Sequence, residues 1–142
     1  MEREILLVED NPDDVELTRI AFAEANIGNP LRVAHDGAQA LSYLDDCARS
    51  GRFPALVLLD LNLPKVNGRE VLQAIRGNRA MHGLPVVMLT TSNEPADVES
   101  SYALGVNSYI QKPVDFEQFV WAIKQVGLYW LVLNLPREMA GG

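Results

Sequence analysis

Two apolar runs in this sequence end in carboxylates, and this pattern restricts the fold more than any other feature. Residues 5–8 read Ile-Leu-Leu-Val and precede Glu9 and Asp10, while apolar residues 55–59 precede Asp60. Unbroken apolar runs of this length are typical of parallel strands that are covered on both faces. Such strands would bring the three carboxylates to the same edge of a sheet. A cluster of this kind is unfavourable unless a cation neutralises it or one member reacts, so it marks a candidate site.

Strand-like and helix-like segments alternate along the chain. Strands are predicted over residues 4–9, 31–35, 55–60, 85–90 and 107–111. The segments that follow them carry apolar residues at helical spacing, and one of these, residues 94–104, stops at Gly105. The repeated order predicts right-handed crossovers and a parallel sheet with helices on both faces. Ligands of such folds bind beyond the carboxyl ends of the strands.

Three helix starts can be read from the sequence. Asn11 and Pro12 provide an N-cap and a first-turn proline. Asp36 begins the second helix, with Gln39 placed as in a capping box. Asp115 is expected to cap the last helix.

Length and composition favour one acidic globular domain. The chain has 142 residues, 48% of them hydrophobic, with 12 basic and 19 acidic residues and a net charge of −7. This balance argues against a domain that grips nucleic acid. The single cysteine, Cys47, is expected to be a buried helical residue in a reducing compartment. No targeting signal and no apolar stretch long enough to span a bilayer is visible, so we expect a cytoplasmic protein that does not enter the membrane.

Further polar residues stand at the ends of other predicted strands. Thr90 ends the fourth strand, and Lys112 follows the fifth. In a sheet with strand order 2-1-3-4-5, these ends are neighbours of Glu9, Asp10 and Asp60. Carboxylates suit Mg²⁺, and a lysine ammonium suits a phosphate. These are the parts needed to transfer a phosphoryl group to a carboxylate.

Five motifs occur in order along the chain. They are Leu-Val-Glu-Asp at residues 7–10, the strand that ends in Asp60, Leu-Pro-Lys-Val-Asn-Gly at 63–68, Leu-Thr-Thr-Ser at 89–92 and Tyr-Ile-Gln-Lys-Pro at 109–113. Together they resemble the receiver domain of two-component response regulators over roughly residues 4–126. The resemblance implies a flavodoxin-like, doubly wound (βα)5 fold. It also implies a protein that catalyses only its own phosphorylation and dephosphorylation and turns over no metabolite.

The resemblance assigns roles to the residues at the strand ends. Asp60 would accept a phosphoryl group from a sensor histidine kinase or a small phosphodonor. Asp10 would bind Mg²⁺ directly, Glu9 would bind it mostly through water, and the backbone carbonyl of Asn62 would complete the protein ligands. Lys112 would bind the phosphoryl oxygens.

The resemblance also implies a conformational switch. Thr90 would move to hydrogen-bond the phosphoryl group, and Tyr109 would rotate inward behind it. The bond that precedes Pro113 would be cis. Gly68 would adopt a backbone conformation that other residues resist.

The C-terminal segment, residues 127–142, continues the apolar character of the last helix beyond the receiver's usual end. Candidate residues for a dimer interface are Trp121, Leu128, Tyr129, Leu131, Val132, Leu133 and Leu135. A helix that is apolar on most sides needs a second partner surface, so we expect a homodimer. The alternative is a tail that folds back over its own domain. The tail and the Asn-Pro-Asp-Asp sequence at residues 11–14 also resemble single-domain regulators paired with phytochrome-type kinases.

Two other functions stay open at this point. An aspartyl-phosphate phosphohydrolase would also place a nucleophilic aspartate at a strand end, but it would want a second aspartate where Asn62 stands. A pseudo-receiver would act only as an interaction module, without the phosphorylation site. No output domain is expected after the last helix, so the signal would pass to a partner whose identity the sequence does not indicate.

Overall fold

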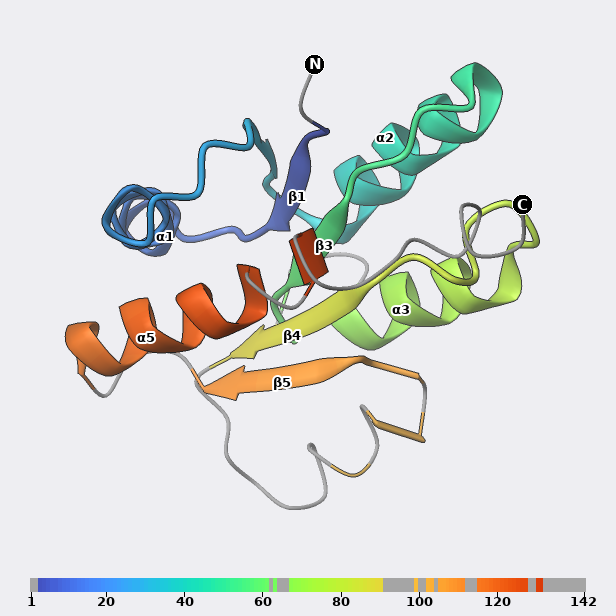
Figure 1. Ribbon diagram of the computed structural model, residues 1–142. Helices are drawn as coiled ribbons and strands as arrows, with labels where there is room; N and C mark the ends of the chain where they lie inside the picture. Colours follow the sequence, from blue (N-terminus) through green and yellow to red (C-terminus); the bar gives the residue numbers. More distant parts are fainter. Residues whose placement is uncertain are drawn as a thin grey trace.

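Five parallel strands form the centre of the protein. A computed structural model describes residues 3–61, 63, 67–90, 99, 102–103, 105–111, 115–127 and 130–131, with the backbone alone at residues 90 and 111. The strands are β1 (Ile5–Val8), β2 (Leu31–Ala34), β3 (Leu56–Leu59), β4 (Val86–Thr90) and β5 (Ser108–Gln111). Their order, β2-β1-β3-β4-β5, confirms the predicted sheet. Figure 1 shows β1 and β3 at its centre.

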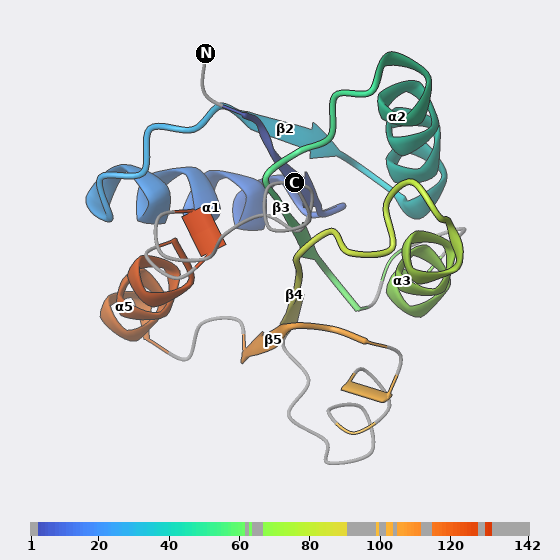
Figure 2. The same cartoon turned by 45° about the vertical axis from the view of Figure 1, so that its right-hand side comes forward.

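Helices cover both faces of this sheet. They are α1 (Pro12–Glu24), α2 (Gly37–Ser50), α3 (Gly68–Gly77) and α5 (Phe116–Gly127). Helices α1 and α5 lie together on one face, and α2 and α3 lie together on the other (Figures 1 and 2). The predicted helix over residues 94–104 falls mostly outside the described residues, although residues 99, 102 and 103 are helical. The doubly wound arrangement that the βα order predicts is therefore present.

Alternate strand residues supply two separate cores. Leu6, Val8, Val57 and Leu59 belong to the cluster beneath α2 and α3. The other residues of β1 and β3 belong to the cluster beneath α1 and α5, which also contains Phe22 and Phe119. Because every side chain of β1 and β3 is buried, these strands read as unbroken apolar runs rather than as alternating ones.

Short polar side chains begin the helices, as predicted. The Asn11 side chain accepts from the Asp13 N–H at 2.9 Å, and Asp115 accepts from the Glu117 N–H at 2.8 Å. Each cap satisfies a backbone donor that the first helical turn leaves without a partner.

The start of α2 carries the expected reciprocal pattern with a shift of one residue. Asp36 accepts from the Gln39 N–H at 2.8 Å. The Gln39 side chain accepts from the His35 N–H at 2.9 Å, one residue before the N-cap. At the other end, Gly51 closes the helix with φ of 74°, a conformation that favours glycine.

Only part of the C-terminal segment is described. Helix α5 ends at Gly127, and Trp130 and Leu131 pack against the core beneath α1 and α5. These two residues therefore cover their own domain, as the alternative to a dimer predicted. The remaining dimer candidates beyond α5 (Leu128, Tyr129, Val132, Leu133 and Leu135) lie outside the described residues.

Two further expectations concern burial and the membrane. Cys47 is buried on α2, with 4% of its surface exposed, as predicted. Among the described residues, no helix combines the length and the apolar character needed to cross a bilayer.

Candidate functional site

Three carboxylates meet at the carboxyl edge of the sheet. Glu9 and Asp10 follow β1, and Asp60 follows the neighbouring strand β3. One oxygen from each carboxylate can be chosen so that all three lie within 4.8 Å of one another. Glu9 is 1% exposed and Asp60 is 7% exposed, while Asp10 is exposed to solvent. The predicted convergence of these side chains is thus present in the fold.

The sheet itself positions the two buried carboxylates. The Glu9 N–H donates to the carbonyl of Ala34 on β2 at 2.9 Å, and the Asp60 N–H donates to the carbonyl of Val8 on β1 at 3.1 Å. Both residues therefore continue the ladder one step beyond the strands. A carboxylate held by its backbone in this way varies little in position, which suits a metal ligand.

One contact within this edge was not predicted. The backbone N–H of Asn11 donates to Oε2 of Glu9 at 3.2 Å. Asn11 thus both caps α1 and orients a carboxylate of the site. Its place between Glu9 and the helix-starting Pro12 is the signal that could have indicated this second role.

The predicted reason for Gly68 is wrong. Positive φ among the described glycines occurs at Gly51 and Gly105 and not at Gly68. Instead, a Cβ at Gly68 would press into the carbonyl oxygen of Asp60 and stand 2.9 Å from the Cα of Leu61. The Gly68 N–H also donates to the Leu61 carbonyl at 3.1 Å. Glycine is needed here because α3 begins directly against the backbone that carries Asp60, and a local sequence pattern does not show that proximity.

The other predicted site residues are described in part. Tyr109 lies on β5 opposite Met88. Its half-buried side chain packs against the core beneath α2 and α3. Thr90 is the last residue of β4, at the carboxyl edge of the sheet, and only its backbone is described. Asn62, Lys112 and Pro113 lie outside the described residues, so their roles stay predictions.

The described part of the site consists of hard oxygen ligands. Burying two carboxylates beside a third favours a bound cation, because the cation offsets both their mutual repulsion and their loss of hydration. Oxygen ligands of this kind suit a small divalent ion. The exposed Asp10 leaves the site open on its solvent side.

Comparisons with known sequences agree with this geometry. Residues 5–124 match the response regulator receiver domain. The response regulator Rcp1 of Synechocystis sp. is 39% identical over 136 residues, which are 93% of this chain and 92% of that protein. The probable methanogenesis regulatory protein FilR2 of Methanothrix harundinacea is 41% identical over 131 residues, which are 92% of this chain and 84% of that protein.

Solved structures show the same fold. The phosphorylated cyanobacterial phytochrome response regulator RcpA has a TM-score of 0.85 and 37% identity, covering 96% of this chain and 99% of its own. The Mn²⁺-bound form of Rcp1 has a TM-score of 0.82 and 36% identity, covering 94% and 98%. The bacteriophytochrome response regulator RtBRR has a TM-score of 0.78 and 52% identity, covering 96% and 84%. With its flavodoxin-like sheet and its acidic edge, this chain belongs to the family of response regulator receiver domains and is similar to the regulators of phytochrome signalling.

Proposed function

We propose that Asp60 is the residue that accepts the phosphoryl group. The observation that supports this role is its position: it is the carboxylate at the end of the central strand β3, within 4.8 Å of two further carboxylates. Asp60 is 7% exposed, so its side chain is held by the fold and still reaches solvent. Its burial distinguishes it from Asp10, the exposed aspartate of the same cluster.

The proposed reaction is an in-line transfer from a phosphohistidine of a kinase or from a small phosphodonor. A carboxylate oxygen of Asp60 attacks phosphorus, a P–O bond forms, and the bond between phosphorus and the donor atom breaks. Lys112 would pair with the phosphoryl oxygens, and Thr90 would later hydrogen-bond one of them. Tyr109 would then turn from its half-buried position, which makes phosphorylation a switch. The chain would turn over no metabolite.

Mg²⁺ is the proposed metal. The carboxylates of Glu9, Asp10 and Asp60, with the backbone carbonyl of Asn62, would hold it, and the ion would offset the charge that gathers on the phosphoryl oxygens. The Mn²⁺-bound form of Rcp1 supports a divalent ion in this family. Mg²⁺ is preferred here because the ligands are all oxygen and the exposed side of the site leaves room for retained water.

Intact mass after incubation with acetyl phosphate and Mg²⁺ tests the site. We expect a gain of one phosphoryl group that is absent without a divalent ion and absent in Asp60→Asn. A matched control is Asp45→Asn, which removes the same charge from an exposed position on α2. A gain in mass that persists in Asp60→Asn would overturn the assignment. No gain in the wild type would instead support an interaction module that is not phosphorylated. Repeating the assay with Mn²⁺ in place of Mg²⁺ compares the two metals.

A sensor histidine kinase is the proposed partner, and a phytochrome-type kinase is the first to test. The similarity to RcpA and RtBRR supports that type. The similar identity to FilR2, a probable methanogenesis regulator, gives a reason to include kinases of other classes. Such kinases take their phosphoryl group from ATP, which is held in the cytoplasm. We therefore propose that this protein is cytoplasmic. Timed transfer from each purified phosphorylated kinase identifies the cognate one, which should phosphorylate this chain fastest.

A homodimer is the proposed assembly. The described residue that supports it is Trp121 on α5, which is 64% exposed although tryptophan is usually more buried. Light scattering should give the mass of a dimer for the wild type and of a monomer for Trp121→Gln. A monomeric wild type, both with and without phosphorylation, would contradict this proposal.

A further inference from the structure

The edge of the sheet at β2 borders a groove that the proposed phosphorylation does not use. A cavity of about 370 Å³ opens to solvent between β2 and α2. Its lining residues are Leu6, Arg32, Val33, Ala34, Gln39, Ser42, Tyr43 and Asp46. Leu6 and Ala34 are buried and form an apolar floor, and polar side chains surround it.

A cation, the exposed Arg32, lies on one side of this groove. The guanidinium of Arg32 lies 5.1 Å from the centre of the Tyr43 ring, whose hydroxyl donates to Oε1 of Glu4 at 3.2 Å. This hydrogen bond holds the ring on which the guanidinium stacks. Within the described residues, Arg32 has no hydrogen-bonded acceptor, so its N–H groups are available to a ligand. A stacked arginine matches the planar geometry of a carboxylate, which it can bind through two hydrogen bonds.

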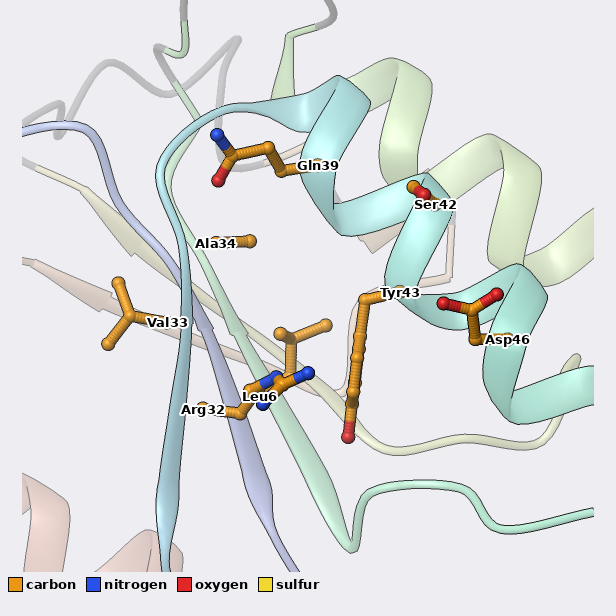
Figure 3. A pocket seen from close by; sticks show the side chains of 8 residues that line it. All are labelled: Leu6, Arg32, Val33, Ala34, Gln39, Ser42, Tyr43 and Asp46. Atoms are coloured by element: carbon orange, nitrogen blue, oxygen red, sulfur yellow. The ribbon is translucent and has the colours of Figure 1, made fainter. Parts of the chain in front are cut away.

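Asp46, the one acidic residue among the described lining residues, does not lie on the same side as Arg32. Figure 3 shows Asp46 and Arg32 on opposite sides of the Tyr43 ring. Asp46 also pairs with Arg49 on its own helix at 3.7 Å. Arg32 is therefore the charged lining residue on its side of the Tyr43 ring, and the carboxylate of Glu4 lies at the hydroxyl end of that ring.

The backbone of β2 provides a second recognition element. Among the described strands, β2 pairs with β1 alone. The Pro30 carbonyl accepts from the Ile5 N–H, and the Ala34 carbonyl accepts from the N–H of Glu9, the residue after β1. In a parallel ladder the alternate residues of β2, Leu31 and Val33, therefore direct their N–H and C=O groups outward. The side chain of Val33 points away from the groove in Figure 3, which leaves its backbone as the part that lines it.

We propose that this groove docks an extended acidic segment of a partner protein. The segment would add to the sheet by hydrogen bonds with Val33, and one of its acidic side chains would enter the groove and bind Arg32. An extended peptide fits better than an enclosed small molecule because the cavity is open and follows a strand edge. The described residues that line this groove are distinct from those proposed for phosphorylation, so peptide binding can be measured on the unphosphorylated protein.

The test uses the full chain and a blocked synthetic peptide, acetyl-Thr-Val-Glu-Val-Thr-amide, followed by amide NMR shifts. We expect saturable shifts at Leu31 and Val33. Replacing the peptide's glutamate by glutamine, or making Arg32→Gln, should weaken binding by about tenfold or more, the scale of a lost charge-assisted hydrogen bond. Arg19→Gln, which removes an exposed arginine from α1 on the opposite face, should leave binding unchanged.

Two further probes separate this proposal from general attraction. A lysine peptide is favoured by the negative net charge, so equal or tighter binding of that peptide would overturn the proposal. Peptides that carry N-methyl groups on one or the other alternating set of amides test strand pairing, because only one set can face β2. Equal binding of both methylated peptides and the parent would refute the pairing. The glutamine and methylated peptides are tested on the wild-type chain, so the result does not depend on how well Arg32→Gln folds.

Discussion

A single methyl group at Gly68 should disturb the backbone that carries Asp60. In Gly68→Ala, the new Cβ would stand 2.9 Å from the Cα of Leu61 and 3.1 Å from the carbonyl carbon of Asp60, and it would press into the carbonyl oxygen of Asp60. Carbon atoms in contact normally stand about 3.5–4.0 Å apart. All of the opposing atoms belong to the backbone, so no side chain can turn aside to relieve the overlap. The start of α3 or the end of β3 must move.

The cost can be set against a matched control. Overpacking typically costs about 1–3 kcal/mol, and the upper end applies here because only backbone atoms oppose the new methyl group. The lower entropy of the unfolded alanine chain offsets about 1 kcal/mol of this cost. We therefore expect Gly68→Ala to lose about 2 kcal/mol, which for a chain of 142 residues lowers Tm by about 7 °C. Gly77→Ala places a methyl group at the end of the same helix with nothing within 4 Å. It should keep or raise stability, by up to about 1 kcal/mol.

Urea and thermal unfolding of the two variants measure this difference, and acetyl phosphate reports its effect on the site. Phosphorylation of Gly68→Ala should be slower than that of the wild type, because the backbone of Asp60 has moved, while Gly77→Ala should be phosphorylated normally. The reasoning is refuted if Gly68→Ala keeps both wild-type stability, within about 0.5 kcal/mol, and the wild-type rate.

Two other predictions concern stability. Arg76 donates to the carbonyls of Leu84 at 2.7 Å and Gly105 at 2.8 Å. Arg76→Met should therefore lower the free energy of unfolding in urea by about 2–4 kcal/mol, and Arg76→Lys should lower it by less. Wild-type stability in Arg76→Met would contradict this prediction. Burial raises the pKa of Cys47 above its ordinary value of 9.0 and also raises the pKa of Tyr43. Both groups ionise at lower pH in the unfolded chain, so the free energy of unfolding should be fully retained below about pH 9 and should fall as the pH rises further. The Tyr43→Phe, Cys47→Ala double variant should show a shallower fall. Equal pH dependence of the free energy of unfolding in the two proteins would count against this prediction.

Local patterns were sufficient for the described strands and helices and for the described carboxylates. The strands that the apolar runs predict are present, although Leu56–Leu59 is shorter than the predicted span of residues 55–60. The ladder bond from the Asp60 N–H continues beyond that strand, which explains why its end is hard to place. The carboxylates converge because parallel strands share a carboxyl edge, and the βα order already implies that edge.

Contacts between segments remote in the chain were not predictable in the same way. Gly68 is required by the approach of α3 to the backbone at Asp60 and Leu61, not by its own φ. Trp130 and Leu131 pack on their own domain, which composition could not distinguish from an interface with a second copy. An apolar side chain favours burial in either place to a similar degree.

The sequence by itself determined the parallel sheet, the starts of the helices and the grouping of Glu9, Asp10 and Asp60, because each follows from residue order and local periodicity. Only the tertiary structure decided which backbone lies against Gly68 and that Arg32 stacks on Tyr43 beside an open strand edge. Both depend on the distances between packed elements. Those distances are set by the whole core, and no short stretch of sequence contains them.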